Sequence, residues 1–353
     1  MTNGWTGGQY SLFRVALAAG AAVSAIGAPA PLGLGAMALA LCLPLLLGYR
    51  DRWAALALAG LQVAGLWGPS PWGPSPGVGA LLLMGLLVAH AFAPVAPWGS
   101  WDARARADAG HGWALPPAVY AAGWIALALC YAGSGYAALA PASVEAFAQR
   151  GVLEWAGIAL ALLFAPLALA RRLRPRLWTA GLAVQLVPAA FGLADLGFAI
   201  WLLHFFAFDP AWVRARALPG PAAVFYDGHC GLCHRVVRFL LSEDADGSAF
   251  RFAPLDSDAF RSQLSAHERD ALPDSVVVLA PGRVPRVRSA AALDLAERLG
   301  GLWRVAALAL RPVPQAWLDR VYDGVAASRQ RVFGREDEAC PRVSTDLRSR
   351  FLD

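Results

Sequence analysis

Two cysteines three positions apart are the residues of this chain whose type and spacing most directly indicate chemistry. Cys230 and Cys233 lie in the stretch Tyr226-Asp-Gly-His-Cys-Gly-Leu-Cys-His234. A C-x-x-C pair that opens a helix places its first sulfur among free amide groups at the positive end of the helix dipole, where a thiolate is stabilised. Because the thiolate is the species that attacks a disulfide, we predict that Cys230 is the nucleophile and Cys233 the resolving thiol.

Three polar neighbours complete the predicted catalytic site. His229 and His234 flank the cysteines, and imidazole groups can add positive charge or relay protons near neutral pH. Asp227 either accepts a proton or shapes the turn before the helix, and both roles stay open. Gly228 supplies the unusual backbone angle that such a turn needs. Thiol exchange of this kind requires no cofactor and no metal, so neither is expected.

The same residues also fit other kinds of site. C-x-x-C-H is the attachment signature of c-type haem, in which His234 would ligate the iron. The methionines, Met1, Met37 and Met84, lie far from the motif, which leaves no methionine for a second axial position. A zinc or copper site is another alternative, and its ligands would be His229, Cys230, Cys233, His234 and Cys340. The third alternative is that the cysteine pair is chemically inert and belongs to a domain that only binds a partner.

The elements that must position the pair follow from the hydrophobic pattern of residues 222–353. The predicted strands are Ala222–Tyr226, Phe250–Ala253, Ser275–Ala280 and Val284–Val287. The predicted helices are Leu232–Ser242, Asp256–His267, Ser289–Leu299 and Gln315–Phe333. Within the last helix, Leu318, Val321, Tyr322 and Val325 recur at helical spacing. The order βαβαββα predicts an α/β thioredoxin-like domain, preceded by a linker over residues 209–221.

The first 208 residues have a different composition. The chain is 58% hydrophobic, against roughly 45–50% in ordinary soluble proteins. Its apolar runs are Tyr10–Ala28, Leu32–Gly48, Trp53–Trp67, Gly77–Trp98, Pro116–Leu139, Val152–Ala170 and Leu177–Phe208. A membrane-spanning helix needs roughly 17–25 such residues. We therefore predict a multi-pass helical membrane domain of seven or eight spans over residues 1–208.

Arginine placement gives the expected orientation. Residues 1–221 hold 12 arginines and 7 acidic residues, whereas residues 222–353 hold 18 of each. The net charge of +5 thus belongs to membrane loops, alternate ones of which are basic, and it sets topology rather than indicating nucleic-acid binding. Pro188 and Gly192 allow the last run to turn and cross twice, and Arg214 and Arg216 favour that option, which puts the C-terminal domain in the cytoplasm. The absence of lysine indicates a GC-rich bacterial genome and hence a bacterial inner membrane.

A few ionisable residues interrupt the apolar runs. Arg14 and His204 lie near run ends, where a long or amphipathic side chain can reach the interface by snorkelling. His90 and Glu154 also fall within the runs, and Asp195 is expected to cap a helix after the Gly192 turn. None of the five is assigned to the site.

The C-terminal part resembles the DCC family of predicted thiol-disulfide oxidoreductases. The residues that carry the resemblance are Tyr226-Asp227-Gly228-x-Cys230-x-x-Cys233, Phe250-Arg-Phe-Ala-Pro-Leu255, Asp274-Ser-Val-Val-Val278, Arg288-Ser-Ala-Ala-Ala-Leu293 and Tyr322-x-x-Val-Ala-x-x-Arg329-x-Arg331-x-Phe333-Gly334, followed by Cys340. The resemblance implies thiol-disulfide exchange and covers essentially residues 221–341. Thioredoxins carry a cis-proline opposite the C-x-x-C pair, and this chain has Asp274-Ser275 at that place.

The N-terminal part bears a weaker resemblance to the HTTM family of transmembrane modules. It rests on Leu12-Phe13-Arg14, Tyr131-Ala-Gly-Ser-Gly135 and His204-Phe-Phe-Ala-Phe-Asp-Pro-Ala-Trp212. The related carboxylases use a lysine, which this chain lacks, so the resemblance implies architecture alone.

The sequence therefore predicts a membrane-anchored thiol-disulfide oxidoreductase. Its partner is a protein with a thiol or disulfide, or a small thiol, and its other contact is the lipid membrane. The alternative is a membrane transport or binding module whose C-x-x-C domain senses redox state or binds a metal.

Overall fold

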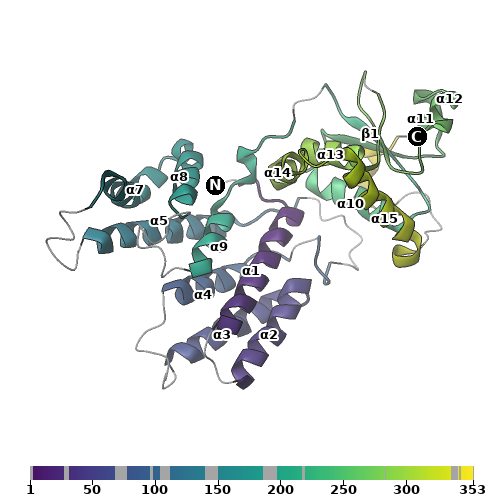
Figure 1. The fold of residues 1–353 in the computed structure, drawn as a ribbon. Coiled ribbons are helices and arrows are strands. Elements are labelled where there is room, and N and C mark those ends of the chain that lie inside the picture. The colour runs from purple at the N-terminus through teal and green to yellow at the C-terminus, as the bar shows by residue number, and fades with distance from the viewer. Residues whose placement is uncertain are drawn as a thin grey trace.

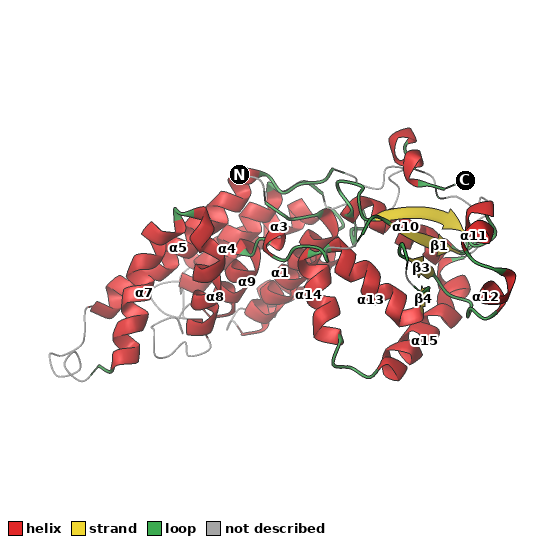
Figure 2. Cartoon of the chain, turned by 90° about the horizontal axis from the view of Figure 1, so that it is seen from above, coloured by secondary structure: helices red, strands yellow, loops and turns green. Residues whose placement is uncertain are grey.

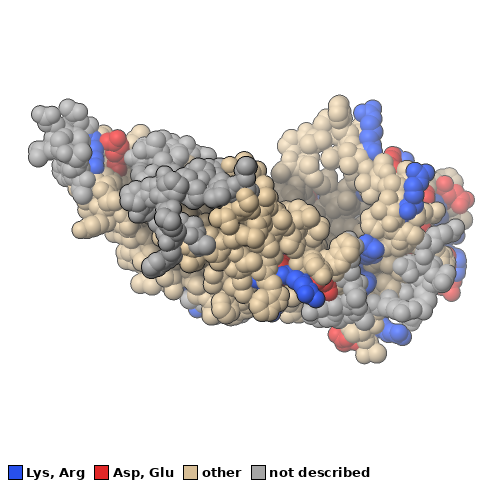
Figure 3. Space-filling model, turned by 90° about the horizontal axis from the view of Figure 1, so that it is seen from below, with Lys and Arg blue, Asp and Glu red and all other residues tan. Residues whose placement is uncertain are grey.

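The computed structural model divides into an N-terminal helical region and a C-terminal region built on a sheet (Figure 1). It describes residues 3–27, 32–67, 78–95, 98–103, 112–139, 150–185, 197–216, 219–282, 284–334, 341 and 343–352. Figure 3 shows more blue and red side chains over the C-terminal region than over the described part of the helical region, which is mostly tan. The composition difference between the two halves thus corresponds to two structural regions.

Apolar helices form the N-terminal region. They are α1 (Gly7–Gly27), α2 (Leu32–Leu47), α3 (Asp51–Trp67), α4 (Val78–Ala91), α5 (Pro117–Leu139), α7 (Val152–Ala168), α8 (Arg174–Gln185) and α9 (Gly197–Ala207). Side chains from α1, α4, α5 and α9 pack into one apolar core that includes Phe13, Leu87, Leu127 and Phe206. Most predicted runs therefore correspond to a helix, although α4 ends seven residues before the predicted Trp98.

Two helices of this region are long and apolar enough to cross a membrane, judged by length and composition alone. They are Gly7–Ile26 and Pro117–Leu139, and several shorter apolar helices accompany them. The predicted larger number of spans stays a prediction. Pro188, Gly192 and Asp195 lie outside the described residues. The prediction that the last run turns there and crosses the membrane twice therefore stays a prediction.

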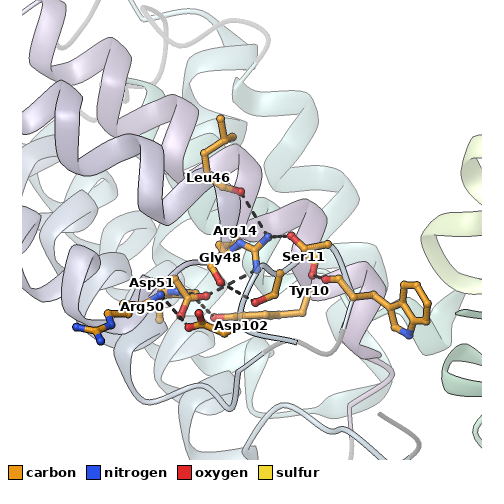
Figure 4. A network of polar contacts seen from close by, with 12 residues as sticks. Tyr10, Ser11, Arg14, Leu46, Gly48, Arg50, Asp51 and Asp102 are labelled. Atoms are coloured by element: carbon orange, nitrogen blue, oxygen red, sulfur yellow. Dashed lines mark hydrogen bonds and ion pairs between the residues drawn. The ribbon is translucent and has the colours of Figure 1, made fainter. Parts of the chain in front are cut away.

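The expectation that Arg14 snorkels is wrong, because its side chain is 0% exposed (Figure 4). The guanidinium donates to the carbonyl oxygen of Gly99, and its Nη1 lies 3.7 Å from Asp51 Oδ2. His90 Nε2 lies 3.5 Å from the same oxygen, and the Tyr10 hydroxyl lies 3.0 Å from His90 Nδ1. A buried charge is tolerable only when it is compensated in this way, so the network joins α1, α3 and α4 at one end.

His204 does not reach an interface either, because it is buried. Its Nδ1 lies 2.6 Å from Gln185 Nε2, and its ring packs edge-on against Tyr131. His204 therefore contacts side chains of α5 and α8 inside the protein, rather than the membrane interface that the sequence analysis expected.

The sheet of the C-terminal region contains β1 (Ala222–Tyr226), β2 (Phe250–Pro254), β3 (Val277–Leu279) and β4 (Arg286–Val287) in the order β2-β1-β3-β4. β1 pairs parallel with β2 and antiparallel with β3, and β3 pairs antiparallel with β4. The helices are α10 (Gly231–Glu243), α11 (Asp258–Gln263), α12 (Ala266–Asp270), α13 (Arg288–Leu299), α14 (Gly301–Leu310) and α15 (Gln315–Phe333). The predicted bounds of β1 and α15 are confirmed.

The observed helices differ from the sequence prediction at two places. Asp256–His267 is not one helix: Leu264 is extended, and Ser265 opens α12 with a capping box to Glu268. Gly300 and Gly301 do end α13, yet α14 begins at once after it. Both glycines have positive φ, and a side chain on Gly300 would collide with the backbone of Ala215, so this tight junction requires glycine.

One buried carboxylate joins the two regions. Glu243, the last residue of α10, accepts hydrogen bonds from Thr6 Oγ1, from Gly8 N at 2.8 Å and from Trp303 Nε1 at 2.6 Å. Gly8 lies in the first turn of α1, where free amides and the helix dipole favour a negative charge. Burial raises the pKa of Glu243 above its usual value despite these hydrogen bonds. The helix that carries the cysteine pair is thereby attached to the first helix of the chain.

Candidate thiol site

The cysteine pair lies where the central strand of the sheet meets its helix. β1 ends at Tyr226, and Cys230 is the N-cap of α10 with extended backbone angles. Its sulfur accepts a hydrogen bond from the backbone amide of Cys233 at 3.4 Å. Both cysteines are free thiols in this structure. The predicted placement of Cys230 at the beginning of a helix is thus what the structure shows, and its sulfur occupies the position of a capping oxygen.

The two sulfurs differ in exposure. Cys230 is fully buried, whereas Cys233 is half-buried. Burial, reinforced by a hydrogen bond with the Cys230 sulfur, raises the pKa of Cys233 well above its usual value. Cys233 is therefore protonated at neutral pH, as suits a resolving thiol that reacts only in the second step. A partner disulfide can reach the Cys230 sulfur only after part of the surface above it has moved.

Asp227 organises the loop before the pair. Its Oδ1 accepts a hydrogen bond from His229 N at 2.9 Å, which closes an Asx turn. Its Oδ2 lies 3.4 Å from Arg329 Nη2. Both carboxylate oxygens thus have partners in the reduced protein, which accords with the turn-shaping role rather than with a free proton acceptor.

The two histidines lie in different surroundings. His229 is exposed at the loop surface. His234 is buried, and its Nε2 lies 2.7 Å from the carbonyl oxygen of Gly228. A carbonyl can only accept, so Nε2 carries the proton and holds the loop to α10. This bond occupies the nitrogen that a haem iron would need.

Arg329 is the residue of this site that the sequence reasoning missed. It comes from α15, and its guanidinium donates to both carboxylate oxygens of Asp274 at 2.8 and 2.9 Å. It also interacts electrostatically with Cys230 and Cys233. Burial opposes its charge, but the Asp274 hydrogen bond raises the pKa of Arg329. A permanent positive charge therefore faces the thiols and lowers the pKa of Cys233 against the effect of burial.

A sequence signal for Arg329 was available. Leu318, Tyr322 and Arg329 follow one another at helical spacing on α15, so the arginine belongs to the face that packs inward. A charge on such a face needs a partner. Its partners, Asp227 and Asp274, lie 102 and 55 positions away, which no local pattern connects to it.

The C-terminal end of α15 closes over the beginning of α10. Gly231 N donates to the carbonyl oxygen of Gly334 at 3.3 Å, and the Arg235 guanidinium lies over the Phe333 ring at 5.1 Å. A side chain on Gly231 would collide with the Phe333 carbonyl oxygen. This close approach makes the end of α15 part of the cover over the cysteine pair.

Replacing Gly231 by alanine is expected to destabilise the protein by about 1–3 kcal/mol, because two backbones must separate. Gly324→Ala on α15 is the matched control, since a methyl group there meets nothing within 4 Å. In a helix interior the control should stabilise by up to about 1 kcal/mol. Chemical unfolding of both variants measures the difference, and equal effects would refute the close contact.

Within the described residues, no three His, Cys, Asp or Glu side chains are grouped closely enough to hold a metal ion. Cys340, the fifth residue of the alternative metal site, lies outside the described residues.

Comparisons with known proteins cover this same domain. The family described as "DCC1-like thiol-disulfide oxidoreductase" matches residues 224–335. The "Uncharacterized protein YuxK" of Bacillus subtilis (strain 168) is 34% identical over 133 residues, which are 36% of this chain and 92% of that protein. No solved structure matches this chain significantly. Nothing in these matches covers the helical region, so its resemblance to the HTTM family stays a prediction. Through its C-terminal domain, the chain belongs to the DCC1-like thiol-disulfide oxidoreductase family.

Proposed function

We propose that this protein is a membrane-anchored thiol-disulfide oxidoreductase whose thioredoxin-like domain acts through Cys230 and Cys233. The family match supports thiol-disulfide exchange. The observation that carries the residue assignment is Cys230 at the N-cap of α10, with the Cys233 amide on its sulfur and the Arg329 charge facing the pair. The partner is a disulfide-containing protein or a small disulfide.

The proposed reaction has two displacements. The Cys230 thiolate attacks one sulfur of the partner disulfide, forming a mixed disulfide while the other partner sulfur leaves as a thiolate and takes up a proton. Cys233 then loses its proton and attacks the Cys230 sulfur, which releases the second partner thiol and closes the Cys230–Cys233 bond. Two electrons pass from the pair to the partner. The reverse sequence oxidises a partner dithiol.

The helical region anchors the domain in this proposal. Two helices are long enough to cross a membrane, and one of them, α1, is joined to α10 through Glu243. The alternating basic loops favour a bacterial inner membrane with the domain on the cytoplasmic side. That side is also the reducing compartment, in which a C-x-x-C pair is more often catalytic than structural.

The mass of the intact protein, alkylated with and without prior reduction of native membranes, tests the proposal. Two alkyl groups that appear on Cys230 and Cys233 only after reduction would show a reversible disulfide. A pair that alkylates without reductant must become resistant after incubation with oxidised glutathione. If Cys230 and Cys233 alkylate fully without reductant, and still do so after incubation with oxidised glutathione, thiol exchange is refuted.

Arg329→Met is expected to slow alkylation of the reduced pair at neutral pH. Removing the positive charge raises the pKa of Cys233 further, and Asp227 and Asp274 lose their shared cation. Arg329→Lys keeps the positive charge on a shorter side chain with a different shape, so its alkylation rate should lie between those of Arg329→Met and the wild type. Alkylation rate against pH distinguishes the variants, and a methionine profile that overlies the wild type would remove Arg329 from the site.

A further inference from the structure

One helix of the C-terminal domain exposes an apolar face that the domain leaves uncovered. The exposed residues of α14 are Val305, Ala306, Leu308, Ala309 and Leu310. We call this set the α14 face. Its opposite side packs against α13 and includes the buried Ala307. Five exposed apolar residues in one ten-residue helix, with no charge among them, require an explanation in a domain that is otherwise rich in charge.

The position of α14 indicates what covers this face. Leu302 N, in its first turn, donates to Gln9 Oε1 of α1 at 2.8 Å, and Trp303 shares Glu243 with the amide of Gly8. α1 is a candidate membrane span that begins at Gly7. Figure 2 shows α14 beside α1, between the helical region and the sheet. α14 therefore starts at the level where α1 would enter the bilayer.

The length and flanks of α14 also fit the membrane surface. Ten residues extend about 15 Å, half of the hydrocarbon thickness, so this helix cannot cross. Residues 301–314 contain two arginines and no acid. Trp317 follows in the first turn of α15 with 65% of its surface exposed. An apolar face bordered by arginine and tryptophan is typical of a helix that lies in the interface.

The arginines also hold α14 to the domain in one orientation. Arg304 Nη1 donates to the carbonyl oxygen of Arg214, and the Arg311 guanidinium donates to Glu297 Oε1 at 2.6 and 3.0 Å. The polar side of the helix thus contacts the protein. The α14 face is the side that is free to contact lipid.

We infer that α14 lies in the membrane surface, with the α14 face among lipid acyl chains and Arg311 and Trp317 at the headgroups. This inference rests on the proposed embedding of the helical region. The domain then has two attachments to the membrane, α1 through Glu243 and α14 directly. α10 is 13 residues long, so the cysteine pair lies about 20 Å from Glu243, at the other end of that helix from the attachment.

The test places an environment-sensitive fluorophore on single cysteines in the full chain, after its native cysteines have been replaced. The probe positions are Leu308→Cys on the α14 face, Ser262→Cys on α11 and Ile125→Cys on the outer surface of α5. Ser262 is the matched control, since it is exposed and α11 lies at the end of the domain away from the helical region (Figure 1). Ile125 is 60% exposed on a candidate span and reports on embedding. The protein is reconstituted in vesicles of equal parts phosphatidylcholine and phosphatidylglycerol.

Quenching by nitroxide on the lipid chains is then compared with quenching by iodide on both sides of the vesicle. We expect the Leu308 probe to be quenched by lipid nitroxide several-fold more than the Ser262 probe, and by iodide several-fold less. A Leu308 probe open to iodide would overturn the inference, and so would one shielded from both quenchers, which indicates a protein partner or a second copy. If Ile125 is quenched by lipid while Leu308 is not, only the placement of α14 fails. If neither is quenched, the proposed embedding fails with it.

Discussion

Cys230→Ser is expected to abolish formation of a mixed disulfide, whereas Cys233→Ser should make that intermediate accumulate. The Cys230 sulfur accepts a hydrogen bond from the amide of Cys233, while burial raises the pKa of Cys233, so we expect Cys230 to attack once the surface above it has moved. Without the nucleophile the rate should fall on the order of a thousand-fold or more. Without the resolving thiol, the first displacement proceeds and the second cannot.

Incubation with oxidised glutathione followed by intact-mass measurement separates the two variants. The glutathione adduct should be absent from Cys230→Ser and persistent in Cys233→Ser. Cys130→Ser, a half-buried thiol on α5, is the matched control and should behave as the wild type. An adduct on Cys230→Ser with none on Cys233→Ser would reverse the roles and make the half-buried sulfur the nucleophile.

Glu243→Ala is expected to loosen the attachment of the C-terminal domain to the helical region. The substitution leaves the Gly8 amide, the Trp303 indole and the Thr6 hydroxyl without their acceptor. A buried donor without a partner costs about 1–3 kcal/mol. The Gly8 contact is buried and the Thr6 and Trp303 contacts are part-buried, so Gly8 should account for most of a loss of about 1–3 kcal/mol. Limited proteolysis within residues 209–221, together with chemical unfolding, measures it.

Glu268→Ala serves as the comparison, since that carboxylate caps the short helix α12 at the surface and should affect little beyond it. Unchanged proteolysis and unfolding in Glu243→Ala would show that this carboxylate is not what holds the two regions together.

The same carboxylate gives a pH dependence with a defined sign. Burial raises the pKa of Glu243 above the ordinary 4.5, so the folded state binds a proton that the unfolded state has already released. Its contribution to stability is greatest below pH 4.5 and decreases as pH rises through the raised pKa. Glu243→Gln should remove this slope from a plot of unfolding free energy against pH. A slope that persists in the variant would assign it to another group.

Local patterns predicted the elements that position the site. β1 is a run of buried apolar residues, and α10 has its apolar residues on one face, so each could be identified within its own segment. The pair at the beginning of α10 followed from the same reasoning. The division of the chain into an apolar and a charged half needed only composition.

Long-range contacts decided what the sequence could not show. Arg14 was expected at the interface, and it is buried because Asp51 and the Gly99 carbonyl converge on it from other segments. The sequence predicted no helix between Ser289–Leu299 and Gln315–Phe333, because nothing local reveals that α14 lies there and contacts Gln9. Within α15, Val321 and Val325 were grouped with Tyr322, yet they are exposed, since the inward face of that helix follows Tyr322 and Arg329.

The continuity of α10 restricts how this two-part architecture can vary during evolution. The helix has Cys230 as its N-cap and Cys233 in its first turn, and its last residue is Glu243, which accepts a hydrogen bond from the first turn of α1. A single-residue insertion between them would rotate one end against the other by about 100° and lengthen the helix by about 1.5 Å. Lineages that gain or lose residues should therefore do so outside this helix. The rotation and the distance along α10 between the cysteine pair and Glu243 would then be inherited unchanged, even where the sequence of the helical region has diverged.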